Sequence, residues 1–173
     1  KPDAIMVGAS GTGAALPQIA LRERGFTGLI YQTHGAVTKD FIRISGKSAE
    51  GVIIPSGPPV VAELQADSAL TKKPGLSLVQ QYEAKYGAGT RNQFAGHSFD
   101  VGEIMKRVVP IALKKAKPGT KEFRQALKDA VESEKEIAAS HGVYNFTPTD
   151  HFGIDERGRV MLTVKNGDWQ LLK

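Results

Sequence analysis

Cysteine is absent from all 173 residues. Without a thiol the chain can form neither a disulfide nor a thiolate nucleophile, and this absence fits an exported protein, although many cytosolic proteins share it. Long apolar runs are also absent, since none approaches the roughly 20 residues that a transmembrane helix needs. The chain begins at Lys1 with no signal-peptide pattern and no initiator methionine. We therefore expect a processed or trimmed piece, whose precursor carried a signal peptide for export.

Charge of one sign is not concentrated anywhere in the sequence. The formal net charge is +5, but the 23 lysines and arginines are scattered among 18 aspartates and glutamates. The densest basic stretch, residues 114–117, falls at the end of a predicted helix, where cations favour the helix dipole. No basic run is interleaved with aromatic residues, so we expect no nucleic-acid partner. The 40% apolar and 24% charged content is typical of a soluble globular domain.

The first third of the chain alternates between strands and helices. Short apolar runs at residues 4–7, 29–31 and 51–54 predict strands that are buried in a sheet. Helical spacing predicts helices after Gly13 and over residues 40–44. This alternation indicates an α/β fold with a parallel sheet. Prolines at positions 55, 58 and 59 are expected to close the third strand.

The middle of the chain predicts three helices between residues 76 and 134. Thr120 is expected to cap the third helix, which would bury Phe123, Leu127 and Val131, and Pro110 is expected to kink the second. Residues 142–146 read as one short strand, which cannot cover three amphipathic helices. We therefore expect a further sheet of this fold upstream of Lys1.

The end of the chain predicts a β-hairpin. Apolar runs at residues 160–164 and 169–172 flank Asn166-Gly167, the strongest short turn signal. Trp169 is expected to cover the sheet rather than touch a ligand.

Two features at predicted strand ends are candidates for ligand binding. The loop Gly8–Gly13 precedes a helix, where exposed backbone donors attract anions. It is neither a Walker motif nor a dinucleotide fingerprint, so it is either a tight turn or a site for a small carboxylate or other polar group. His34 follows the second strand beside the same crevice. Three further histidines are too dispersed for a metal site: His97, His141 and His151.

Catalytic motifs are missing from the sequence. Ser10 is followed by glycine, but the surrounding residues do not form a nucleophile elbow. No histidine and acid pair is identifiable by spacing. The residues therefore favour a binding protein over an enzyme.

An ordered set of segments resembles the type I periplasmic solute-binding proteins of the branched-chain amino-acid and amide ABC transporter family. These segments occur in the same order as in the family and cover almost the whole chain: residues 1–5, 8–11, 16–18, 22–25, 31–35, 50–52, 82–87, 98–100, 142–146, 150–153 and 166–169.

The resemblance implies the fold and the domain organisation. The fold would be the α/β Venus-flytrap fold, with parallel sheets flanked by helices, incomplete in this chain and represented by its carboxy-terminal half. Residues 1–56 and 160–173 would belong to the carboxy-terminal lobe, and residues 60–157 to the amino-terminal lobe. The hinge crossings would be residues 57–59 and 158–159.

The resemblance also implies the ligand contacts. They would be Ser10, Gly11, Thr12 and His34 on strand-end loops, and Phe99 at a position that is often aromatic in the family. Amino-acid binders usually place an acid near the position of His34, and this sequence has none there. The ligand would therefore be a branched-chain amino acid or a small carboxylate without an amine, aromatic acids included.

The function implied is that of the periplasmic, substrate-binding component of an ABC importer. Its partners would be the small-molecule ligand and the permease in the inner membrane, and it would need no metal or organic cofactor. A ligand-sensing regulatory domain of the same fold and a small α/β enzyme are the alternatives.

Overall fold

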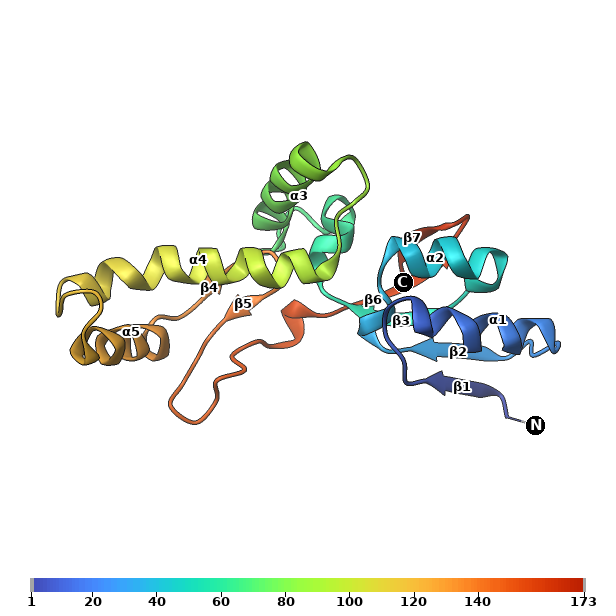
Figure 1. Ribbon diagram of the computed structural model, residues 1–173, viewed down its shortest axis with the longest axis horizontal. Coiled ribbons are helices and arrows are strands. Elements are labelled where there is room, and N and C mark those ends of the chain that lie inside the picture. Colours follow the sequence, from blue (N-terminus) through green and yellow to red (C-terminus); the bar gives the residue numbers. More distant parts are fainter. Residues whose placement is uncertain (1, 173) are drawn as a thin grey trace.

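The computed structural model describes residues 2–172, so Lys1 and Lys173, which the predicted domain bounds include, lie outside the described residues. Two regions lie side by side along the long axis of the molecule (Figure 1). The sheet region comprises residues 4–56 and 160–171, and the helical region comprises residues 65–154. Two connecting segments, residues 57–64 and 155–159, join them. The chain therefore passes between the regions twice.

The sheet region is built on five strands in the order β1-β2-β3-β6-β7. The first three strands pair in parallel, as predicted, and β6 and β7 extend the sheet in antiparallel fashion. Asn166 and Gly167 both adopt positive φ, which is the geometry of a tight hairpin turn. The predicted hairpin is confirmed. The strands are β1 (Ala4–Val7), β2 (Leu29–Gln32), β3 (Ile53–Ser56), β6 (Val160–Lys165) and β7 (Asp168–Leu171).

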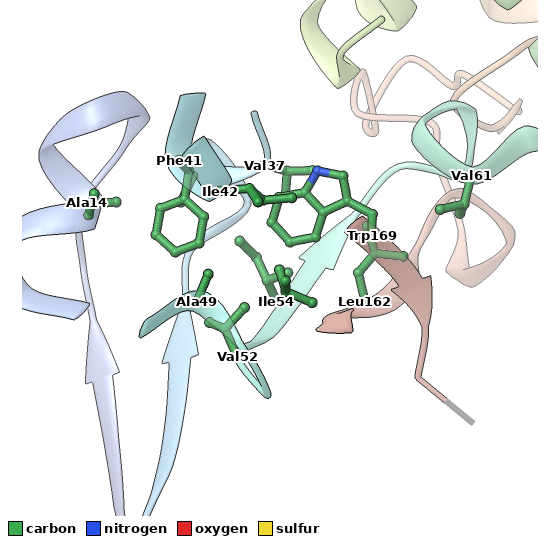
Figure 2. Close-up of a cluster of buried hydrophobic side chains, with 13 residues drawn as sticks. Ala14, Val37, Phe41, Ile42, Ala49, Val52, Ile54, Val61, Leu162 and Trp169 are labelled. Atoms are coloured by element: carbon green, nitrogen blue, oxygen red, sulfur yellow. The ribbon is translucent and has the colours of Figure 1, made fainter. Parts of the chain in front are cut away.

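Two helices, α1 (Ala15–Glu23) and α2 (Lys39–Ser45), cover one face of this sheet (Figure 1). The Thr38 hydroxyl caps α2 by accepting from the Phe41 amide at 3.1 Å. Beneath the helices lies a cluster of buried side chains, in which the rings of Phe41 and Trp169 stack with centroids 6.2 Å apart (Figure 2). Trp169 therefore covers the sheet, as predicted.

The other face of the sheet has no helix against it among the described residues 2–172 (Figure 1). Met6 on β1 is 61% exposed, and Leu29 on β2 is also exposed. These side chains alternate with the buried Val7 and Ile30, as the period of a strand requires. One side of the sheet thus presents apolar surface to the outside.

The helical region contains α3 (Lys72–Tyr86), α4 (Gln93–Leu113) and α5 (Lys121–Ser133), followed by the small antiparallel pair β4 (Ile137–Ala138) and β5 (Val143–Tyr144). The Thr120 hydroxyl accepts from the Phe123 amide at 3.1 Å, so the predicted N-cap is confirmed. Helix α5 buries Ala126 and Ala130 fully. The three larger side chains that were expected to be buried are only partly so: Phe123, Leu127 and Val131.

Helix α4 is apolar on two sides. Ile104 and Val108 pack into a cluster with Ala130, Ile137 and Tyr144. On another side of the helix three exposed side chains recur at i, i+7 and i+11: Phe94, Val101 and Met105. A helix with two apolar sides is normally covered on both.

Proline has less effect on the local structure than expected. Strand β3 does not stop before Pro55 but continues to Ser56, with Pro55 opposite Met161. Strand β2 pairs with β3 only at Ile53. Position 55 therefore has no β2 residue opposite it, and the missing amide hydrogen of Pro55 costs no hydrogen bond to β2. Helix α4 likewise remains one continuous element across Pro110. Proline has no amide hydrogen to donate to the carbonyl of the residue four positions earlier, which is the exposed Lys106.

Candidate functional site

A cavity of about 570 Å³ lies where the two regions meet. Its walls come from both regions and its remaining boundary from both connecting segments. Ligands of two-domain proteins commonly bind at such junctions. The sheet region contributes His34, Pro55 and Ser56; the helical region contributes Gln93, His97, His141, Phe152 and Ile154; the connecting segments contribute Gly57, Asp155, Glu156, Gly158 and Arg159.

His34 is placed by the turn that follows β2. It opens a short 3₁₀ turn, His34–Ala36, at the carboxyl end of the strand. The Thr33 hydroxyl donates to the Ala9 carbonyl and so ties this turn to the loop after β1. A Cβ atom at Gly35 would lie 2.8 Å from Cβ of Ser10, so only glycine fits there. The two strand-end loops are therefore in contact.

Gln93 stands at the opposite wall, as the first residue of α4. The Asn92 carboxamide caps this helix by accepting from the Ala95 amide at 3.0 Å. The side chain of Gln93 is fully buried, and its Nε2 donates to the backbone carbonyl of His34, 59 residues away. Its Oε1 has no partner among the described residues. Gln93 thus bridges the two regions at the cavity.

Two histidines stack beside Gln93. The rings of His97 and His141 have centroids 3.9 Å apart and an interplanar angle of 24°. A side chain at Gly57 would overlap the His141 ring, and one at Gly96 would lie 3.2 Å from its Nδ1. The ring therefore fills the space between a connecting segment and α4.

The environment keeps these rings neutral near pH 7. Burial, reinforced by His97 and His34, lowers the pKa of His141 to about 4. Partial burial also lowers the pKa of His97, with nearby Asp100 opposing the change and His34 adding to it. A neutral imidazole has one donor and one acceptor nitrogen, so each ring can make a directional contact to a polar ligand.

A buried carboxylate holds His141 in place. Asp100 is 1% exposed and accepts from the Ser140 amide at 2.7 Å, the Ser140 hydroxyl at 2.5 Å, the His141 amide at 2.8 Å and the Tyr144 hydroxyl at 2.8 Å. Burial and the adjacent Asp100 raise the pKa of Tyr144, so its hydroxyl remains a donor. These bonds fix the backbone that carries the His141 ring.

The structure separates the residues that were predicted to contact a ligand. His34 lines the cavity. Ser10, Gly11 and Thr12 belong to the loop that touches the His34 turn, but they do not line the cavity itself. Phe99 lies in a separate groove between α3 and α4, together with Tyr82.

Sequence reasoning did not select Gln93, and it noted His97 and His141 only as too dispersed for a metal. The lining residues come from four distant parts of the chain, so no local spacing could have assembled them. The helix that begins at Gln93 contains other polar residues, Asp100 and Glu103 among them, so the residue type of Gln93 gave no signal.

The arrangement suits noncovalent binding of a small polar molecule. It offers three imidazoles and an amide as hydrogen-bonding groups, Arg159 as a cation, and Asp155 and Glu156 as anions. Within residues 2–172, no three histidine, aspartate or glutamate side chains are grouped so as to hold a metal ion. In the same part of the chain, none of the helices has the length and apolarity needed to cross a membrane.

Comparison with solved structures gives close relatives. An extracellular ligand-binding receptor from Rhodopseudomonas palustris HaA2 is 65% identical, with a TM-score of 0.96 over 99% of this chain and 48% of the receptor. Another receptor of that description from the same strain is 40% identical, with a TM-score of 0.90 over 99% of this chain and 47% of its own.

A more distant structure shares the fold. A leucine-binding protein, LivK, from Thermotoga maritima is 22% identical, with a TM-score of 0.72 over 99% of this chain and 44% of its own. No family model and no curated protein matches the chain. The chain spans about half the length of the structures that it matches.

The two-region α/β architecture, the cavity at the junction and the close match to receptors at 65% and 40% identity lead to one assignment. The chain is related to the extracellular ligand-binding receptors and has, in part, the α/β fold of the type I periplasmic binding proteins, a fold that it shares with the leucine-binding protein.

Proposed function

We propose that this chain is the carboxy-terminal half of the periplasmic substrate-binding component of an ABC importer. The complete receptor would bind a small molecule between two lobes and deliver it to a permease in the inner membrane. The observation that carries the proposal is the cavity at the junction, lined by both regions and by both connecting segments. The names of the relatives, extracellular ligand-binding receptors, support it.

The two connecting segments are the proposed hinge. Residues 57–59 and 158–159 would be hinge crossings between a carboxy-terminal lobe, which contains the sheet region, and an amino-terminal lobe, which contains residues 60–157. Gly57, Gly158 and Arg159 line the cavity, so rotation about these segments changes its width. Ligand contacts made only in the closed form would shift the equilibrium toward closure.

The rest of the receptor would cover the surfaces that are exposed here. The bare face of the sheet and the open side of α4 carry Met6, Leu29, Phe94, Val101 and Met105. Apolar faces of this kind normally pack against another layer. The relatives are about twice as long as this chain, which leaves enough residues for such layers.

The ligand would be a branched-chain amino acid or a small carboxylate, aromatic acids included. Arg159 at the cavity can pair with a carboxylate, and the apolar side chains of Phe152 and Ile154 can contact a hydrocarbon part. We propose binding without chemical turnover and without a cofactor. Hydrogen bonds to the neutral imidazoles would orient the molecule.

The experiment is titration of the complete receptor with L-leucine, L-isoleucine and a panel of small aliphatic and aromatic carboxylates. Calorimetry should show one site per receptor for at least one compound, and small-angle X-ray scattering should show a smaller radius of gyration when it is bound. A receptor that binds none of these classes, or binds without closing, would contradict the proposal. Chemical conversion of a bound compound would indicate an enzyme instead.

A further inference from the structure

We propose that Gln93 is a specificity-determining residue: its Oε1 accepts a hydrogen bond from a hydroxyl or N–H group of the ligand. The inference rests on the proposed solute-binding function and adds a chemical requirement to it. The ligand must carry a hydrogen-bond donor in addition to any carboxylate.

The first reason is the fixed position of Gln93. It follows the N-cap Asn92, so the geometry of the helix start sets the direction of its side chain. The side chain is fully buried and lines the cavity. A glutamine in this place cannot turn away to reach solvent.

The second reason is the orientation of the amide group. Nε2 donates to the backbone carbonyl of His34, and a carbonyl can only accept. Rotating the amide by 180° would bring two oxygens together, so the assignment of nitrogen and oxygen is settled by this partner. Oε1 therefore always points away from His34, as an acceptor.

The third reason is that the acceptor has no partner. Within residues 2–172 no group donates to Gln93 Oε1. A buried polar group left without a hydrogen bond destabilises the folded protein. Gln93 lines the cavity, so a molecule inside it would complete the hydrogen bonding of Oε1.

The donation to His34 also makes Oε1 a better acceptor. Hydrogen bonds in a chain polarise one another, so an amide that donates through its nitrogen accepts more strongly through its oxygen. This series of hydrogen bonds runs from the His34 carbonyl in the sheet region through Gln93 to the ligand. The donor group of the ligand would therefore connect both walls of the cavity. A ligand that lacks the donor would leave Oε1 unpaired in the closed form.

The test uses pairs of compounds that differ in one donor, titrated into the complete receptor by calorimetry. L-Leucine and 4-methylpentanoate differ by the ammonium group, and 4-hydroxybenzoate and benzoate differ by the hydroxyl group. For the pair that fits the cavity, the donor-bearing compound should bind at least about tenfold more tightly than its partner. The two pairs also distinguish an ammonium from a hydroxyl as the donor.

The variant Gln93→Met keeps the length of the side chain and removes both polar atoms. In this variant the ratio of the two dissociation constants should fall to less than about threefold, since no acceptor is left to discriminate. Gln170→Met on the exposed part of β7 is the matched control and should keep the wild-type ratio. If Gln93→Met does not fold, equal wild-type affinities for the two members of a pair still overturn the inference.

The outcomes separate the inference from the proposed function. Binding of both members of a pair with equal affinity to the wild type overturns the inference and leaves the function standing. A preference that survives unchanged in folded Gln93→Met also overturns it, because another group would then accept from the donor. Binding of none of the four compounds and of none in the wider panel of carboxylates overturns both.

Discussion

The sheet region and the helical region bury their apolar side chains to different extents. The sheet region contributes 12 residues, Phe41, Ile54 and Trp169 among them, to a cluster of 13 buried residues, and the connecting segment contributes Val61 (Figure 2). The helical region has a cluster of six, and the long helix α4 leaves Val101 56% exposed. The first region is therefore held by its own interior on one face, whereas the second leaves more apolar surface uncovered, which under our proposal the rest of the receptor would cover. One wall of the cavity is better supported than the other.

The largest effect should come from removing that outside support. The isolated 173-residue chain should bind the ligand about tenfold to several thousandfold more weakly than the complete receptor. Each lost polar contact is worth about 0.5–1.5 kcal/mol, and the helical wall loses the layers that would hold it. Calorimetry with one ligand on both proteins checks this, with light scattering to detect association through the exposed side of α4.

Equal affinities from a monomeric fragment would contradict the comparison. The helical region would then be as self-sufficient as the sheet region, and the proposed lobes would have to be redrawn.

The second largest effect should come from Asp100, which organises the helical wall from within. In Asp100→Asn an NH₂ group replaces one oxygen and meets donors instead of acceptors, so about two of the four hydrogen bonds are lost. We expect the complete receptor to lose about 2–4 kcal/mol of unfolding free energy. Urea denaturation measures it, and Asp129→Asn on the exposed face of α5 is the control, with a change within about 0.5 kcal/mol.

A loss no larger than that of Asp129→Asn would show that the helical wall does not depend on its buried carboxylate. Weaker ligand binding by folded Asp100→Asn would show in addition that the hydrogen bonds of Asp100 position His141.

A smaller effect is expected from acid. The pKa of His141 is about 4 in the folded protein, against about 6.5 in the unfolded chain. The unfolded state therefore binds more protons between these values, and stability is full above pH 6.5 and falls as the pH drops toward 4. The lowered pKa of His97 acts in the same direction. The loss attributable to His141 should reach about 1–3 kcal/mol near pH 4.

Melting temperatures of the complete receptor at pH 7, 6 and 5 measure the onset of this loss. His141→Phe keeps a ring in the space beside Gly57 and should reduce the pH dependence. His151→Gln, which changes an exposed histidine, should leave it as in the wild type. A steeper pH dependence in His141→Phe would contradict the assignment of a neutral buried imidazole.

Much of the fold could be predicted from the sequence because its signals are local. The Asn166-Gly167 turn, the Thr120 cap and the alternation of strands and helices each depend on residues close together in the chain. The misses have physical reasons too. β4 is only two residues long, and Pro55 is tolerated in β3 because its neighbour β2 has already diverged.

The site could be predicted only in part, because it depends on contacts between distant segments. His34 directly follows a strand, and in open α/β sheets ligands bind in the crevice at the carboxyl ends of the strands. Gln93 and His141 reach the cavity only because α4 and the Ser140–His141 segment are brought against the connecting segments. No periodicity in the sequence encodes that meeting. Phe99, selected by resemblance alone, lies in another groove, and its contact with a ligand remains a prediction.

The most direct test of the central claim, that the junction cavity binds the solute, is calorimetry on the complete receptor with His34→Ala. The substitution removes the imidazole from the cavity but keeps the backbone carbonyl that accepts from Gln93, so the bridge between the regions is retained. We predict binding about tenfold weaker, with a melting temperature within about 2 °C of the wild type. Unchanged affinity together with a clearly lower melting temperature would contradict the claim, because His34 would then serve folding and the solute would bind elsewhere.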